Sequence, residues 1–208
     1  MTGAVAAPRV VVITDAALCP IPEMLARASA IAAPTIRFQI REKALDGGPL
    51  LAFARDLIAR VRPAGAEVWL NDRADVALAA GADGLQLPEA GLSLADARAI
   101  ARGIALGCSR HSPEAASDAA RAGADVVQLG PIWATPSKLG LLEPLGPEAL
   151  GRFRGRSALV AVGGIDSPER AREAAAAGAD AVAVIRAAWI SDDPARMIAA
   201  LVSAVEQR

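Results

Sequence analysis

The chain has 208 residues and a formal net charge of −1, with 22 lysines and arginines against 23 aspartates and glutamates. This length suits one domain with a sizeable core, and the balanced charge excludes the basic field of a bulk nucleic-acid binder. Two cysteines are too few for a disulfide scaffold or a four-cysteine metal site. Neither a signal peptide nor a membrane-length apolar stretch is visible, so we expect a cytoplasmic protein without membrane or nucleic-acid partners.

Short apolar runs with strand character recur along the whole chain. They lie at 9–14, 36–39, 67–70, 84–87, 104–108, 126–129, 158–162 and 181–185. They are too short for helices, and those that follow the repeated phrase Ala-Gly-Ala-Asp, at 84, 126 and 181, are apolar on both faces. This pattern is typical of parallel strands that are covered by helices.

Helical patterns alternate with these runs. They lie at 21–32, 49–62, 73–80, 94–102, 113–122, 147–153, 168–177 and 194–206, and Ser93, Ser112 and Ser167 occupy N-cap positions. Eight strand–helix alternations predict an α/β fold, a single compact (β/α)8 TIM barrel over residues 1–208. An open doubly wound sheet is the alternative, but its glycine fingerprint is absent after the first strand, which runs into Thr14.

The second strand carries an unusual set of polar side chains. Its alternate positions are Arg37, Gln39, Arg41 and Lys43. Apolar residues occupy the other face, so we expect these four to face the mouth of the barrel. Converging cations need an anion, which predicts a phosphate or diphosphate ligand. The alternative is a rim of ion pairs, in which Arg41 binds Asp72 or Glu42.

Other strands end in polar groups at the same rim. We expect Asp72, after the third strand, to bind a magnesium ion that bridges diphosphate oxygens or to cap the next helix. His111, the only histidine, follows the fifth strand beside Ser109 and is a candidate acid–base group.

The last three strands end in loops suited to anions. The sixth leads to Thr135, Ser137 and Lys138, which we interpret as a clamp that closes over a ligand. Gly163-Gly164 follows the seventh strand and Ile185-Arg186 the eighth. Backbone N–H groups at these two places form the phosphate cradle of many TIM barrels.

Eight short motifs, in order along almost the whole chain, resemble those of thiamin phosphate synthases and their sister thiazole tautomerases. They are Ile13-Thr14-Asp15, Gln39-Ile40-Arg41-Glu42-Lys43, Asn71-Asp72-Arg73, Gly84-Leu85-Gln86-Leu87, Ser109-Arg110-His111-Ser112, Gly130-Pro131-Ile132, Thr135-Pro136-Ser137-Lys138 and Gly163-Gly164-Ile165. The resemblance implies a transferase of thiamin biosynthesis. Such an enzyme joins hydroxymethylpyrimidine diphosphate to thiazole phosphate, with magnesium, and releases pyrophosphate.

The same resemblance implies a role for each site residue. Gln39 and Ser109 would contact the pyrimidine, and Arg41, Lys43, Asn71 and Lys138 would hold the diphosphate. Asp72 would bind the metal, and Thr135 and Ser137 fall within a Thr-x-Thr-Lys pattern of the synthases. Gly164, Ile185 and Arg186 would cradle the thiazole phosphate. Catalysis would depend on Arg41, Lys43 and Lys138, with His111 as a further candidate.

One position departs from the synthase pattern and keeps other functions open. Synthases carry a second metal-binding aspartate past the fourth strand, where this chain has Gly91. Either Glu89 would substitute for it, or Arg110 and Arg186 would replace part of the metal's charge. The tautomerases also lack this aspartate, and there His111 would shuttle the proton. A third hypothesis is a homologous barrel that binds a thiamin precursor without catalysis.

The synthase is favoured because the diphosphate-binding set has no use in a tautomerase. We expect small phosphorylated substrates, and a homo-oligomer is compatible with the sequence.

Overall fold

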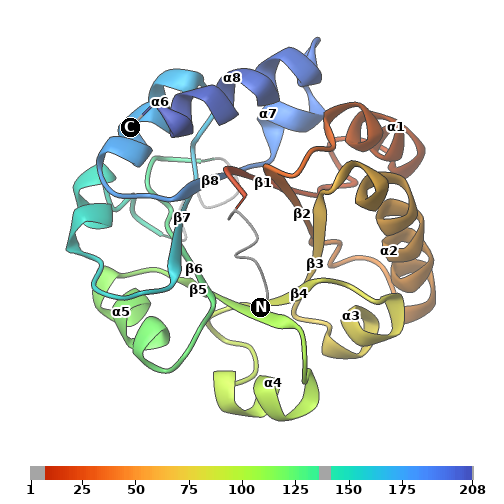
Figure 1. The fold of residues 1–208 in the computed structure, drawn as a ribbon, viewed down its shortest axis with the longest axis horizontal. Coiled ribbons are helices and arrows are strands. Elements are labelled where there is room, and N and C mark those ends of the chain that lie inside the picture. Colours follow the sequence, from red (N-terminus) through yellow and green to blue (C-terminus); the bar gives the residue numbers. More distant parts are fainter. Residues whose placement is uncertain (1–7, 136–141, 208) are drawn as a thin grey trace.

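The structure, a computed structural model, describes residues 8–135 and 142–207, and it is a closed parallel barrel (Figure 1). The strands are β1 (Val10–Ile13), β2 (Ile36–Ile40), β3 (Glu67–Asn71), β4 (Gly84–Leu87), β5 (Ala105–Arg110), β6 (Val126–Leu129), β7 (Ala158–Val162) and β8 (Ala181–Val184). They follow sequence order around the ring, and β8 pairs with β1. The predicted TIM barrel is confirmed.

Helices form the outer ring in Figure 1. They are α1 (Ile21–Ile31), α2 (Gly47–Val61), α3 (Ala74–Ala80), α4 (Leu94–Ile100), α5 (Pro113–Arg121), α6 (Pro168–Ala176), α7 (Arg186–Trp189) and α8 (Pro194–Glu206), with 3-10 turns η1 (Arg62–Ala64) and η3 (Pro147–Arg152). The side chains of Ser93, Ser112 and Ser167 accept backbone N–H bonds at the starts of α4, α5 and α6, which confirms the predicted caps. In the described ranges no helix has the length and apolar character of a membrane span.

Two elements differ from the prediction. The segment expected to be an α-helix at 147–153 is a 3-10 helix, η3, and α7 was not predicted. α7 has only four residues, which is too short to produce a hydrophobic period, and Arg186 is its first residue.

The repeated phrase Ala-Gly-Ala-Asp ties neighbouring strands together. Its glycines end α3, α5 and α6 with positive φ, where a residue without Cβ is favoured. The carboxylates of Asp83, Asp125 and Asp180 then accept the backbone N–H of Val68, Leu106 and Leu159, at 2.8, 2.8 and 3.0 Å. Each aspartate therefore anchors the start of the strand before its own.

Apolar side chains fill both sides of the sheet. The larger core lies between strands and helices and includes Phe38, Leu57 and Trp189. A smaller cluster lines the barrel interior and contains Val11, Ile13, Trp69, Val126, Val160, Ala181 and Ala183. Alternation along the strands therefore separates an outer core from a filled lumen.

Arg37 lies in the lumen, but far from the mouth. It is 6% exposed, its Nε lies 2.8 Å from Glu67 Oε2, and its guanidinium carbon lies 3.9 Å from the Trp69 ring centroid. Glu67 begins β3, so this cluster belongs to the N-terminal end of the barrel. The expectation that Arg37 faces the mouth is therefore wrong, because Glu67 neutralises it at the opposite end.

Candidate active site

The C-terminal ends of the strands bring most of the predicted site residues to one rim. Arg41 and Lys43 follow β2, Asn71 ends β3, Asp72 follows it, and Ser109 lies near the end of β5 with His111 just beyond. Thr135, Gly164, Ile185 and Arg186 follow β6, β7 and β8. Ser137 and Lys138 lie outside the described residues.

The segment that carries the two rim cations is held by the loop after β1. The backbone N–H of Arg41 donates to Thr14 Oγ1 at 2.9 Å, and Thr14 is 1% exposed. Glu42 Oε2 accepts the N–H of Ala16 at 3.0 Å. Within the described part of the chain neither Arg41 nor Lys43 forms an ion pair. The alternative of an ion-paired Arg41 therefore finds no support here.

A layer of buried amides lies beneath the rim. Gln128 Nε2 donates to Gln39 Oε1, and Gln86 Nε2 donates to Ser109 Oγ at 3.0 Å. The three glutamines are 1–3% exposed. Because Gln39 and Ser109 are each held by a second side chain, their orientation is fixed before a ligand arrives.

Sequence reasoning missed the two supporting glutamines. Neither Gln86 nor Gln128 is among the predicted site residues, although each interrupts an apolar strand one residue before a leucine. A polar residue within an apolar strand of a barrel must be satisfied in the lumen, and that was the available signal.

His111 is oriented by one hydrogen bond. Its Nδ1 donates to the carbonyl oxygen of Gly130, and because a carbonyl only accepts, Nδ1 carries the proton. Nε2 lies 4.0 Å from Glu89 Oε2. The imidazole is therefore held by one nitrogen, and its other nitrogen faces the Glu89 carboxylate.

Asp72 stands beside Gly91, which has no side chain to supply a second carboxylate. A Cβ built on Gly91 would lie 3.0 Å from Asp72 Oδ1 and 2.9 Å from the Pro88 ring. Asp72 has a φ of 66°, a backbone conformation that is uncommon outside glycine. Residues 8–135 and 142–207 contain no group of three potential metal ligands. The donor set fits a magnesium ion shared with substrate phosphates, not one held by protein alone.

One predicted alternative at this rim is wrong, and the structure limits another. α3 begins at Ala74 with Arg73 as its N-cap residue, so Asp72 does not cap the helix. Arg110 donates to the carbonyl of Ser109 at 2.7 Å and lies beside Cys108, whose side chain belongs to the outer core. Burial raises the pKa of the Cys108 thiol, and the Arg110 charge opposes this effect. Arg110 is thus engaged on the outer side, while Arg186 is exposed.

The turn after β7 presents unused backbone donors. Gly163 and Gly164 have φ values of 100° and 70°. The N–H groups of Gly163, Gly164 and Ile165 find no acceptor among the described residues, and the same holds for the first two N–H groups of α7. Successive free N–H groups in such a turn form an anion-binding concavity.

These features define a class: a TIM barrel whose mouth has cations without a described ion-pair partner on one side and turns with free backbone N–H groups on the other. A family model described as thiamine monophosphate synthase matches residues 10–188, and the chain belongs to this family.

Individual relatives support the same assignment. A putative thiamine-phosphate synthase of Geobacter sulfurreducens is 39% identical over 173 residues, which cover 82% of this chain and 81% of that protein. The thiamine-phosphate synthase of Chlorobium luteolum is 40% identical over 190 residues, which cover 90% and 88%. The structure of a thiamine phosphate pyrophosphorylase from Pyrococcus furiosus superposes with a TM-score of 0.85 at 31% identity and 96% coverage of both chains.

Proposed function

We propose that this barrel is a thiamine-phosphate synthase of thiamin biosynthesis. It joins hydroxymethylpyrimidine diphosphate to thiazole phosphate and releases pyrophosphate. The observation that carries this proposal is the rim itself. There Arg41 and Lys43 follow β2 without an ion pair to any described residue, and N–H groups without a described acceptor follow β7 and β8. Two phosphorylated substrates need two such anion sites in one mouth. We further propose a cytoplasmic location, and a homo-oligomer stays a prediction.

The diphosphate site drives the reaction. As the bond from the pyrimidine methylene carbon to the diphosphate oxygen breaks, its electron pair leaves with the diphosphate. Arg41, Lys43 and Asn71 stabilise that growing negative charge more strongly than they bind the ground state. The lone pair of the thiazole nitrogen then forms the new C–N bond, and no proton is transferred. Lys138 and Ser137 complete this clamp in the proposal, with Thr135 at its start.

The other substrate groups are bound and oriented. Gln39 and Ser109 contact the pyrimidine from the buried amide layer, which fixes its methylene carbon toward the thiazole. Gly164, Ile185 and Arg186 hold the thiazole phosphate on the opposite side of the mouth. Both reactants are thereby held in a fixed relative orientation, so that a bimolecular reaction becomes an effectively unimolecular step within the bound complex.

Magnesium has one protein ligand in this proposal, Asp72. When bound, the ion would neutralise charge on the diphosphate. Asp72 would hold the ion, and Gly91 has no side chain that would add a ligand.

A second candidate activity is tautomerisation of thiazole phosphate through His111. The observation that favours it is the position of His111 Nε2, which lies 4.0 Å from the Glu89 carboxylate and is suited to move a proton. No feature of the described residues favours the non-catalytic barrel.

One assay separates these activities. Purified protein is incubated with both substrates and magnesium, and thiamin phosphate and pyrophosphate are quantified, with thiazole phosphate alone as a parallel sample. We expect the two products in equal amounts and no isomerisation of the thiazole. Isomerisation without thiamin phosphate would identify the tautomerase, and loss of synthesis with EDTA would exclude an arginine that replaces the metal.

A further inference from the structure

We infer that Arg170 is a positioning residue of the phosphate cradle. Its side chain holds the turn Gly163–Ile165 in the conformation that presents the backbone N–H groups of the turn to the thiazole phosphate. This inference rests on the proposed function. It assigns a role to a side chain that the sequence motifs do not include.

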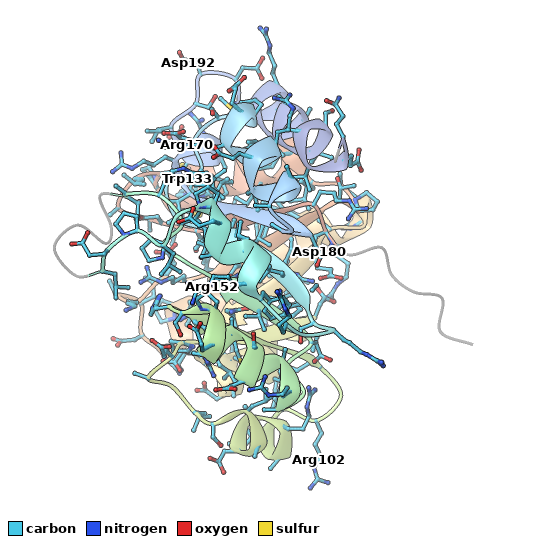
Figure 2. All side chains as sticks on the ribbon, turned by 90° about the vertical axis from the view of Figure 1, so that its left-hand side faces the viewer. Arg102, Trp133, Arg152, Arg170, Asp180 and Asp192 are labelled. Carbon is cyan, nitrogen blue, oxygen red and sulfur yellow. The ribbon has the colours of Figure 1, made fainter. Side chains whose placement is uncertain are left out.

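The Arg170 side chain connects three parts of the rim. It begins in the first turn of α6, and its Nη1 donates to the carbonyl oxygen of Gly164 at 2.6 Å and to Asp166 Oδ2 at 3.1 Å. Its guanidinium carbon lies 5.6 Å from the centroid of the Trp133 ring, and Figure 2 shows the two side chains as neighbours at this end of the molecule. The guanidinium therefore bridges α6, the turn after β7 and the loop after β6.

The bond to Gly164 sets the direction of a free donor. In a trans peptide the C=O and the next N–H point in opposite directions. Because Arg170 binds the carbonyl of Gly164, the N–H of Ile165 points away from Arg170, and it has no acceptor among the described residues. Without Arg170 this peptide is free to rotate, since glycine tolerates many conformations.

The turn also packs directly on the loop after β6. The N–H of Ile132 donates to Val162 at 2.9 Å, and the N–H of Trp133 donates to Gly163 at 3.1 Å. A Cβ on Gly164 would lie 2.6 Å from the Cβ of Trp133, so the two backbones touch. Arg170 stacks over the same tryptophan, and it thus stabilises the junction between the cradle and the segment that leads to Thr135.

The test measures binding rather than turnover. Calorimetry gives the affinities for inorganic phosphate, thiazole phosphate and pyrophosphate in wild type and in Arg170→Ala. We expect the variant to bind phosphate and thiazole phosphate roughly 10-fold more weakly or worse, because one charge-assisted hydrogen bond that orients the donors is lost. Pyrophosphate, bound at the rim of β2 and β3, should change less than about twofold.

Two variants serve as controls. Arg172→Ala removes an exposed arginine of the same helix and should leave all three affinities unchanged. Arg170→Lys keeps one donor for Gly164 and should recover part of the phosphate affinity. If Arg170→Ala fails to fold, Trp133→Leu removes the ring beside the guanidinium and should weaken phosphate binding in the same direction.

An Arg170→Ala protein that is folded and binds phosphate as tightly as wild type would overturn the inference. If Trp133→Leu is measured instead, a phosphate affinity equal to that of wild type would also overturn the inference. Equal weakening of phosphate and pyrophosphate would also overturn it, because the effect would then not belong to the cradle. Phosphate binding is measured without the pyrimidine substrate. A failed synthase assay would therefore refute the proposed function, while the phosphate affinities would still test the role of Arg170.

Discussion

Asp72 is the proposed magnesium ligand, and its backbone conformation is unusual. Its φ of 66° places it in the left-handed region, which aspartate and asparagine tolerate better than other residues with a Cβ. Backbone strain of this kind persists where the surrounding structure holds it, and it is concentrated at functional sites. The N–H of Asp72 donates to the carbonyl of Gln86 at 2.9 Å, which holds the carboxylate at the rim beside Gly91.

Two substitutions separate the charge of Asp72 from its conformation. Asp72→Asn keeps a side chain that tolerates the left-handed backbone, so its free energy of unfolding should stay within about 0.5 kcal/mol of wild type. Its turnover should fall about 10²-fold, because the single metal ligand is lost. Asp72→Ala should lose activity equally and also lose about 1 kcal/mol of stability. Turnover is measured as a function of magnesium concentration, and the free energy of unfolding is measured with urea. Full activity in Asp72→Asn would refute the metal role.

Arg37 has a structural role, because its buried side chain forms an ion pair with Glu67 inside the barrel. Burial lowers the pKa of its guanidinium, and the charge of Glu67 opposes that shift. Glu67→Ala would leave a buried charge unpaired, so we expect it to lower the free energy of unfolding by about 3 kcal/mol. The matched control is Asp118→Ala, which removes one partner of an exposed ion pair and should cost less than about 1 kcal/mol. Equal urea midpoints for both variants would contradict this account.

At the scale of elements, strand–helix alternation was predictable because eight short apolar runs alternate with capped helical patterns. The strand bounds agree within one or two residues, whereas η3 and α7 are short turns whose form depends on tertiary contacts. The position of the candidate site residues at one rim was predictable where they follow strand ends. Gln86 and Gln128 were not, because only the closed barrel shows which strand residues meet across the lumen. The sequence also did not predict that Arg110 lies on the outer side of β5, beside Cys108.

The aspartates of the repeated phrase hold pairs of strands, and one can be tested directly. Asp180→Ala removes the acceptor for the N–H of Leu159 on β7 and should cost about 1–3 kcal/mol of unfolding free energy. Asp192→Ala is the control, since Asp192 is exposed and has no hydrogen bond or ion pair to any other described residue; Figure 2 labels both positions. Chemical denaturation measures the difference, and a loss as large in the Asp192 variant would disprove the role of Asp180.

Across the whole molecule, several exposed carboxylates titrate below their ordinary range. A hydrogen bond from Arg73 lowers the pKa of Asp75 to about 2, and backbone N–H groups at helix starts lower the pKa of Glu114 and Glu169. A lowered carboxyl pKa adds stability above the ordinary values of 3.8 and 4.5, and this stability is lost as pH falls through the lowered values.

We therefore expect the urea midpoint to be level near neutral pH and to fall as pH drops from about 4.5 toward 2. Denaturation at a series of pH values measures this. A midpoint that rises on acidification would contradict the assigned contacts.

In the proposed reaction, the cations that follow β2 stabilise the leaving diphosphate in the mouth of the barrel. The most direct measurement compares thiamin phosphate formation by Lys43→Ala and His111→Ala under saturating substrates. We expect Lys43→Ala to lower turnover roughly 10²-fold or more and His111→Ala to lower it much less. If His111→Ala abolished thiamin phosphate formation and Lys43→Ala retained it, the cations after β2 would not be the groups that drive the reaction.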